Sequence, residues 1–200
     1  MNCGGLKNSF KAFLALATLA FSVSVVLGQG TVIFANNVAF GTPADRLVRD
    51  MNGVPLVGTN YSAQLYYGAL GASEMDLVSV SDLPARFRSS ATTQPGTWFE
   101  GDSRYRTLDG FAPGENVSLQ VRVWDSFAGS TWEQAAGVNF AGTQYGSSAV
   151  FGYYIPVVCG NNPFCYTMDN LRGFMLVPEP SVIALAVFGA GGFLLLRRRK

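Results

Sequence analysis

The chain has no histidine and little cysteine, and these absences exclude several kinds of chemistry. Histidine is the commonest general base and the commonest transition-metal ligand in proteins. None of the 200 residues is a histidine, which excludes Ser-His-Asp and Cys-His catalysis and every His-ligated zinc site. Of the three cysteines, Cys159 and Cys165 have no other soft ligand near them in the sequence. We therefore expect no catalytic residue, no metal ion and no cofactor, and a protein that is not an enzyme.

An excess of positive charge is also lacking once the two ends of the chain are set aside. The whole sequence has 14 Lys and Arg residues against 13 Asp and Glu residues. Lys7 and Lys11 lie near the start, and four cations close the chain. Glu179 is the one acid in these two end segments, so the middle holds eight cations and twelve acids, a net charge of −4. No basic surface for nucleic acid is left there, and we expect no nucleic-acid partner.

The first 28 residues have the order of a secretory signal peptide. Lys7 and Lys11 precede the apolar run "AFLALATLAFSVSVVLG", which ends at Gly28 and is followed by small residues rather than a charged stop. A positive start, an apolar core and a small-residue end are typical of a cleaved signal. We predict a signal peptide over residues 1–28, read by the Sec machinery and signal peptidase, and a mature N-terminus between Gln29 and Thr31.

Export changes the interpretation of the two later cysteines. Cys159 and Cys165 enclose "GNNPF", a turn-forming stretch that brings the ends of two segments together. In an oxidising compartment a disulfide is the favoured state of such a pair. We predict a disulfide between them, whereas Cys3 precedes the apolar run and leaves with the leader.

Residues 29–176 alternate apolar and polar side chains with the two-residue period of half-buried strands. The clearest run is "NVSLQVRVWD", residues 116–125, which has one apolar face, Val117, Leu119, Val121 and Val123, and one face of Ser118, Gln120, Arg122 and Trp124. Similar runs lie at 31–36, 61–68 and 148–158, with weaker ones at 77–80, 98–99, 105–108 and 171–176. Together with one helical turn at 132–136, they predict an all-β domain, an antiparallel β-sandwich or jelly-roll-like fold.

Aromatic residues are the candidate ligand contacts of this domain. Flat rings stack on pyranose faces while nearby amides supply hydrogen bonds. The candidates are Trp98, Trp124 and Trp132, together with Tyr66, Tyr67, Tyr153 and Tyr154. Trp124 is expected to point outward, because it alternates with the apolar face of its strand. The alternative is that these rings fill the core or cover a sheet.

Scattered acids are a second set of candidates. Paired carboxylates hydrolyse glycosides, and carboxylate oxygens bind calcium. The acids concerned are Glu100, Asp102, Asp109, Glu115, Asp125 and Glu133, and their spacing matches no calcium loop. Surface solvation is the simpler interpretation.

The chain closes with a proline-rich motif, an apolar segment and a basic tail. Pro178 and Pro180 lack amide donors, so "VPEPS" is expected to be extended, exposed and unable to join the sheet of the domain. A helix over residues 181–196 spans about 24 Å at roughly 1.5 Å per residue, and long cationic side chains make up part of the difference from the ~30 Å membrane core. The tail, Arg197, Arg198, Arg199 and Lys200, stays on the cytoplasmic side, so the domain lies outside.

These three parts in this order resemble the PEP-CTERM sorting domain of Gram-negative, exopolysaccharide-producing bacteria. The resemblance covers residues 177–200: the motif Pro178, Glu179 and Pro180, an apolar helix containing glycines, and the basic tail. It implies an exosortase, a membrane-embedded transpeptidase, as partner, and cleavage near the motif. The implied route is export, an inner-membrane intermediate that faces the periplasm, and then the cell surface or extracellular matrix.

The resemblance says nothing about residues 29–176, so their function has to be considered separately. We expect a non-enzymatic envelope or extracellular-matrix protein. One alternative is a carbohydrate-binding module that uses exposed aromatics, with exopolysaccharide as its partner. Another is a glycoside hydrolase, which requires two carboxyls about 5 to 9 Å apart in a cleft.

Overall fold

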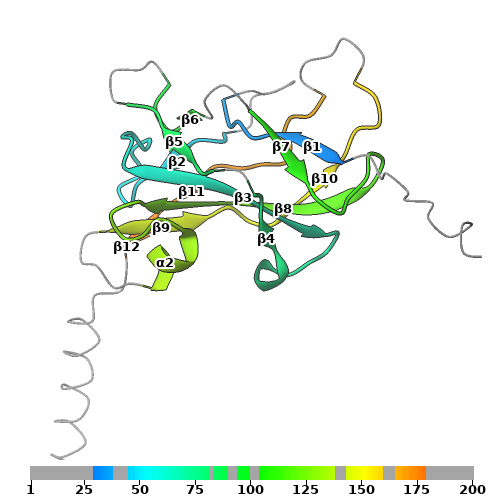
Figure 1. The fold of residues 1–200 in the computed structure, drawn as a ribbon. Helices are drawn as coiled ribbons and strands as arrows, with labels where there is room; N and C mark the ends of the chain where they lie inside the picture. The colour runs from blue at the N-terminus through cyan, green and yellow to red at the C-terminus, as the bar shows by residue number, and fades with distance from the viewer. Residues whose placement is uncertain are drawn as a thin grey trace, which may run out of the picture.

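Strands account for almost all of the regular structure (Figure 1). The computed structural model describes residues 29–37, 45–81, 83–89, 94–99, 104–137, 143–159 and 165–178. Within these ranges lie one α-helix, α2 (Trp132–Gly137), and one 3-10 turn, η2 (Glu74–Asp76). The predicted all-β class is confirmed, and the sheets are antiparallel apart from one short parallel pair.

Both ends of the chain lie outside the described residues. These ends include the predicted signal peptide, Glu179 and Pro180 of the motif, the apolar segment and the basic tail. In the part of the chain that the structure describes, no helix is long and apolar enough to cross a membrane.

One sheet of eight strands dominates the fold. Its main path runs in the order β12 (Val177–Pro178), β9 (Gln144–Ser147), β8 (Asn116–Asp125), β3 (Tyr61–Ala69), β5 (Ala85–Phe87) and β6 (Trp98–Phe99). Two further strands pair off this path, β10 (Phe151–Tyr154) with β8 and β4 (Val78–Ser79) with β3. Two short sheets complete the structure, β1 (Gly30–Ile33) with β7 (Tyr105–Leu108), and β2 (Val48–Arg49) in parallel with β11 (Phe174–Met175).

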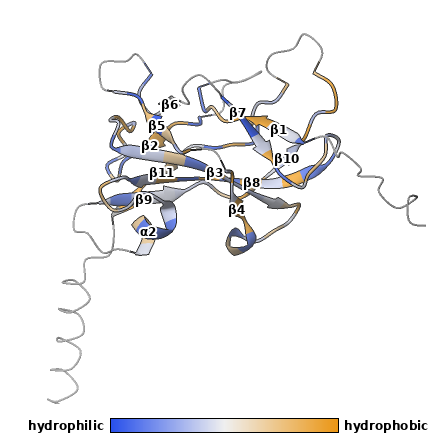
Figure 2. Cartoon of the chain, in the orientation of Figure 1, coloured by the Kyte–Doolittle hydropathy of each residue, from blue (hydrophilic) through white to orange (hydrophobic). Residues whose placement is uncertain are grey.

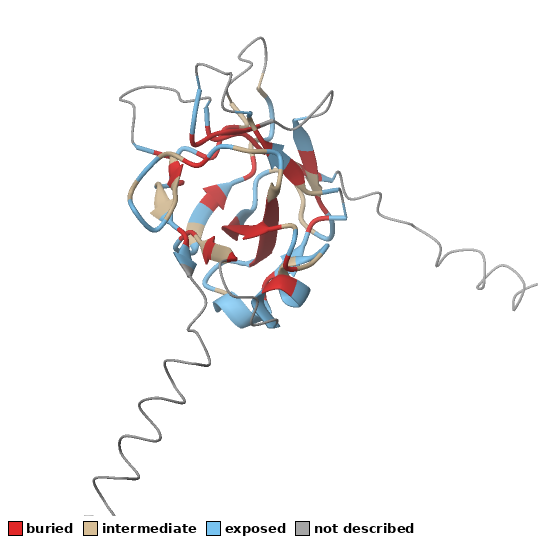
Figure 3. Ribbon diagram, turned by 90° about the vertical axis from the view of Figure 1, so that its left-hand side faces the viewer, coloured by how far each residue is buried: buried red, intermediate tan, exposed pale blue. Residues whose placement is uncertain are grey.

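The long strands β3 and β8 form the centre of the large sheet. Their antiparallel register runs from Tyr61 opposite Asp125 to Ala69 opposite Val117. The predicted apolar face of β8 is confirmed, because Val117, Leu119, Val121 and Val123 are all fully buried. They share one core with Ala63, Leu65 and Tyr67 of β3. Figure 3 shows the buried residues concentrated in the middle of the molecule.

The two short sheets cover this apolar face. Val32 of β1, Leu108 of β7 and Val48 of β2 belong to the same core as the central strands. Trp98 also lies in this core, fully buried, with its ring 4.9 Å from that of Phe34. Its indole nitrogen donates a hydrogen bond to the carbonyl of Phe34 at 3.0 Å. Trp98 is therefore a core residue, and its prediction as a ligand contact is wrong.

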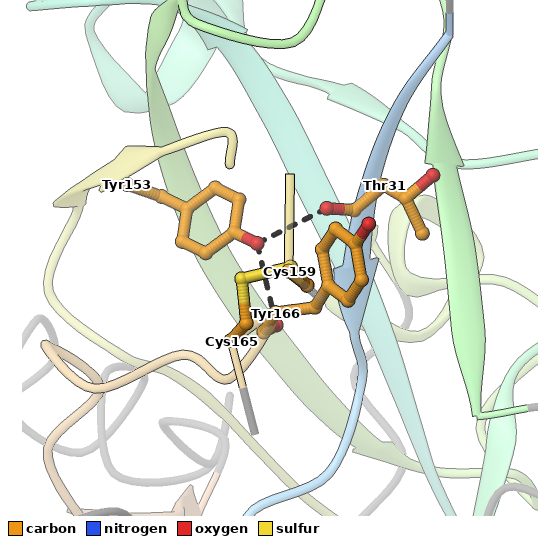
Figure 4. The surroundings of a disulfide bond; sticks show 5 residues. All are labelled: Thr31, Tyr153, Cys159, Cys165 and Tyr166. Atoms are coloured by element: carbon orange, nitrogen blue, oxygen red, sulfur yellow. Dashed lines mark hydrogen bonds between the residues drawn. A yellow bond between two sulfur atoms is a disulfide. The ribbon is translucent and has the colours of Figure 1, made fainter. Parts of the chain in front are cut away.

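A disulfide joins Cys159 to Cys165, as predicted, with their Cα atoms 5.5 Å apart. Beside it, the hydroxyl of Tyr153 donates to the carbonyls of Thr31 and Tyr166, at 3.0 and 3.3 Å (Figure 4). Thr31 belongs to β1 and Tyr153 to β10, so these bonds fasten the disulfide region to the first strand.

The expected exclusion of the motif from the sheet is wrong for its first residue. Val177 and Pro178 form the edge strand β12, with Val177 opposite Tyr145 and Pro178 opposite Gln144. An edge strand accepts proline because one of its sides needs no hydrogen-bond donor. Leu176, only 1% exposed, connects β12 to β11 and donates its backbone N–H to Arg49 at 2.8 Å. The domain therefore extends into the motif.

Candidate functional site

The second face of β3 and β8 is polar, yet it is buried. Gln64 of β3 and Gln120 and Arg122 of β8 point away from the apolar core, and each is at most 8% exposed. Two excursions of the chain cover them. The first consists of residues 70–81 and 83–84 and includes η2 and β4, and the second consists of residues 126–137 and includes α2. Figure 1 shows β4 and α2 on the same side of the central strands. We call this face the outer face.

Hydrogen bonds from the outer face hold the coverings in place. Gln64 donates through its amide nitrogen to the carbonyl of Val80 at 2.9 Å, and Arg122 donates through Nη2 to the carbonyl of Glu74 at 2.7 Å. Gln120 donates to the carbonyl of Ser148 at 3.0 Å. A buried polar group without a partner would cost about 1 to 3 kcal/mol, so these pairings make the polar face compatible with burial.

Helix α2 is short, and Thr131 caps its N-terminus. Thr131 accepts the backbone N–H of Gln134 through its hydroxyl at 3.3 Å, and Gln134 accepts the backbone N–H of Ser130 at 3.0 Å. The Gln134 side chain thus reaches back to the residue before the N-cap Thr131, which is a variant of the capping box. The helix carries hydrophilic and hydrophobic residues (Figure 2), and its buried residue, Ala135, packs with Trp124 and Ala128.

A hollow of about 350 Å³ lies between the two coverings. Its lining comes from β3 (Gln64, Tyr66), from β8 (Trp124), from the first covering (Ser79, Leu83, Pro84) and from the second (Ser130, Thr131, Trp132, Glu133). Aromatic rings with a few convergent polar groups, in a volume above about 300 Å³, are typical of small-molecule sites. This hollow is the candidate site.

Two of the three predicted tryptophans reach the hollow. Trp124 points to the outer face as expected, but α2 covers it, so it is only 1% exposed and the expected exposure is wrong. Its indole nitrogen donates to the carbonyl of Gly129 at 3.0 Å. Trp132 is half-buried, and its ring meets that of Tyr145 edge-to-face at 5.5 Å. Trp132 is thus the more accessible of the two rings.

A network of three side chains organises one wall of the hollow. The hydroxyl of Tyr66 donates to Oε1 of Glu133 at 2.6 Å. The guanidinium of Arg122 lies 3.9 Å from the centre of the Tyr66 ring and 5.6 Å from that of Trp132. Its Nη1 atom is 4.0 Å from Oε1 of Glu133. A cation over a ring face is favourable, so Arg122 supports both aromatic side chains from below.

The network keeps Glu133 ionised and Tyr66 neutral. Burial alone would raise the pKa of Glu133, but hydrogen bonds from Tyr66, from its own backbone N–H and from Thr131, with the charge of Arg122, outweigh burial and lower that pKa below its ordinary value of 4.5. Burial, followed by the hydrogen bond to Glu133 and its charge, raises the pKa of Tyr66 far above 10.0. At neutral pH the hollow therefore presents a carboxylate and a phenol.

Of the four candidate acids that the structure describes, only Glu133 lines the hollow. Asp109, Glu115 and Asp125 lie elsewhere, where they accept hydrogen bonds from Gln29, from the backbone of Ala112 and from the backbone of Phe127. Glu100 and Asp102 lie outside the described residues. Within the described ranges, no group of three or more acids, cysteines or histidines is placed to hold a metal ion.

The remaining predicted aromatics are dispersed. Tyr67 and Tyr153 belong to the apolar core, whereas Tyr154 is 52% exposed on β10 and does not line the hollow. Sequence analysis missed six of the lining residues: Gln64, Ser79, Leu83, Pro84, Ser130 and Thr131. The alternation of "YSAQLYYG" places Gln64 on the same face as Tyr66, a usable signal, but Leu83 and Pro84 lie in a stretch without any period.

No protein family, no curated protein and no solved structure matches this chain. The function is therefore inferred from the chain's own residues.

Proposed function

We propose that this protein is an exported, surface-sorted, non-enzymatic envelope or extracellular-matrix protein whose β domain binds carbohydrate in the hollow. The order of the chain supports the sorting part: a signal-like start, the Pro178–Pro180 motif, an apolar segment and a basic tail. The hollow carries the binding part, because it combines Tyr66, Trp124 and Trp132 with hydrogen-bonding groups.

Sugar recognition suits this lining for a physical reason. A pyranose ring has an apolar face that stacks on an aromatic ring and a rim of hydroxyls that need hydrogen-bond partners. Trp132 supplies an accessible ring, and Glu133, with its side chain 62% exposed, supplies acceptor oxygens. Ser130 and Thr131 add hydroxyls beside them.

Binding is favoured over hydrolysis. A glycoside hydrolase needs two carboxyls that flank the scissile bond, whereas Glu133 is the only acid among the described residues that line the hollow. Its lowered pKa also makes it a poor general acid, since that role requires a raised pKa.

We also propose the finer description of the fold as a β-sandwich. The shared core between the large sheet and the two short sheets supports two facing layers. The parallel pairing of β2 with β11 is a departure from a purely antiparallel sandwich.

Retention of the purified full-length protein on polysaccharide columns tests the binding part. Replacing Trp132 with Ala should weaken binding about tenfold, since one stacked ring contributes roughly 0.5–1.5 kcal/mol beyond its buried area. Ser79→Tyr is a second test, because Ser79 is exposed at the hollow and the added ring blocks it without disturbing the core. Phe127→Ala, an exposed aromatic outside the lining, is the matched control. Undiminished binding by both test variants would contradict the proposal.

Fractionation of the producing cells tests the sorting part. Glu179→Ala should leave membrane insertion intact, because insertion depends on apolar burial, and should trap uncleaved protein in the inner membrane. Neutral replacements of Arg197, Arg198, Arg199 and Lys200 should instead release precursor with its apolar tail into the periplasm or medium. Mass spectrometry of the mature protein should find its N-terminus between Gln29 and Thr31. Normal processing of both variants would mean that the tail serves only as an anchor.

A further inference from the structure

Among the described residues that line the hollow, one side chain, Glu133, is charged at neutral pH. The other nine described lining residues are aromatic, apolar, hydroxyl or amide residues. The Glu133 side chain is 62% exposed, so a ligand in the hollow meets its carboxylate directly.

The nearby cation offsets this charge only in part for a ligand, because it does not line the hollow. Arg122 lies beneath the Tyr66 ring, with its side chain 9% exposed, and it is absent from the lining. Its Nε donates to Oε1 of Gln120 at 2.8 Å and its Nη2 to the carbonyl of Glu74 at 2.7 Å. Two of the three guanidinium nitrogens are thus bonded to the sheet and to its covering, and the group lies behind the Tyr66 ring rather than in the lining that a ligand meets.

The orientation of Glu133 is also fixed. Tyr66 donates to Oε1 at 2.6 Å, and such a charge-assisted bond holds the carboxylate in one place. A carboxylate has about four lone-pair sites, so Glu133 retains the capacity to accept hydrogen bonds from sugar hydroxyls.

We propose that Glu133 determines specificity in the hollow, which accepts uncharged pyranose units and rejects uronic acids. This inference rests on the proposed carbohydrate binding. A ligand carboxylate roughly 5 Å from Glu133 would weaken binding by about tenfold at low salt, whereas a hydroxymethyl group at the same position would donate a hydrogen bond.

Matched ligands isolate this effect. Galacturonan oligosaccharides and the same oligosaccharides after chemical reduction of their carboxyls differ only in the group at C6. Calorimetry with the full-length protein in micelles, at about 20 mM salt, should show the reduced form binding at least about tenfold tighter. Raising the salt to about 500 mM should narrow the difference to roughly threefold or less, because screening acts on the charge alone.

Two variants separate the local carboxylate from the net charge of the domain. Glu133→Gln preserves an acceptor for Tyr66 and should bring the two ligands to within about threefold of each other. Glu115→Gln removes an equal charge from an exposed turn outside the hollow and should leave the discrimination unchanged. Equal effects of the two variants would overturn the role of Glu133.

The outcomes distinguish the specificity role of Glu133 from the proposed carbohydrate binding on which it rests. Tight binding of the reduced oligosaccharide with weak binding of the acidic one supports both. Binding of both ligands with equal affinity overturns the specificity and leaves carbohydrate binding intact. Failure of the wild-type protein to bind either ligand overturns the proposed function, and the inference with it.

Discussion

The two faces of the central strands β3 and β8 are both buried, but for different reasons. The inner face is apolar, and its side chains, such as Leu119 and Val121, lie in a continuous core with the two short sheets. The outer face is polar, and its buried side chains have hydrogen-bond partners: Gln64 and Arg122 donate to the first covering, and Gln120 donates to the carbonyl of Ser148. Apolar area stabilises the first arrangement, while satisfied polar groups make the second possible. The candidate site lies between the two coverings, where they leave part of the outer face uncovered.

The largest expected loss of stability comes from creating a cavity in the apolar core behind the inner face. Leu119→Ala removes a fully buried side chain from the core and should lower the free energy of unfolding by about 3 kcal/mol, through lost transfer energy and the remaining cavity. Urea unfolding followed by tryptophan fluorescence measures this change. A loss below about 1 kcal/mol would mean that the inner face is not a tightly packed core.

The disulfide beside the inner core should have the next largest effect. Replacing Cys159 and Cys165 with Ser should lower the free energy of unfolding by about 2 kcal/mol, because the closed loop is short. Unfolding of the wild-type protein with and without a reducing agent gives an independent value. If the urea midpoint of the wild-type protein were the same with and without the reducing agent, this prediction would be wrong. Full alkylation of both cysteines in the unreduced, folded protein would contradict the disulfide itself.

A smaller loss of stability is expected from a substitution on the outer face, where hydrogen bonds rather than buried apolar area hold the side chains. Arg122→Met keeps much of the apolar stem but removes the donors to Gln120 and Glu74, and should cost about 1 to 2 kcal/mol. The control is Arg172→Met, since Arg172 is exposed and bonds only local carbonyls. If the two substitutions were equally mild, the outer face would not depend on its hydrogen bonds.

The smallest expected effect is a pH dependence from Glu133. Its pKa is lower in the folded protein than its ordinary value of 4.5, so its stabilising contribution is present above about pH 4.5 and is lost as pH falls through the folded value. Tyr66→Phe removes the hydrogen bond that contributes most to this lowering. Thermal melting of the variant between pH 7 and pH 3 should show a slightly shallower loss than the wild type. A steeper loss would contradict the proposed network.

The same comparison shows what a sequence pattern can and cannot predict. The two-residue period predicted β8, β3 and the inner face correctly, because alternation is a local property of one strand. It did not predict that Trp124 would be covered, since the covering comes from α2, which begins seven residues after the end of β8. The two-residue strand β2 is too short to show a period. Trp98 lies in the core through contacts with distant residues such as Phe34.

The position of the hollow depends on similar long-range placement. Glu133 was one of six scattered acids, and nothing in their spacing singled it out. Its role follows from Tyr66, which lies 67 positions earlier and donates to it. The disulfide was easier to predict, because its two cysteines are only six positions apart and a turn separates them.

The edge strand β12 is joined to the predicted membrane segment by a very short linker. Pro178 is paired in the sheet, and only Glu179 and Pro180 separate it from Ser181, where the predicted membrane segment begins. Three residues of extended chain reach about 10 Å. If that segment spans the bilayer, the sheet edge formed by β12 and β9 stands within about 10 Å of the membrane surface and turning of the domain is restricted. A processing enzyme then has to work in that gap, and a cut after Pro178 would release a domain that retains every strand described.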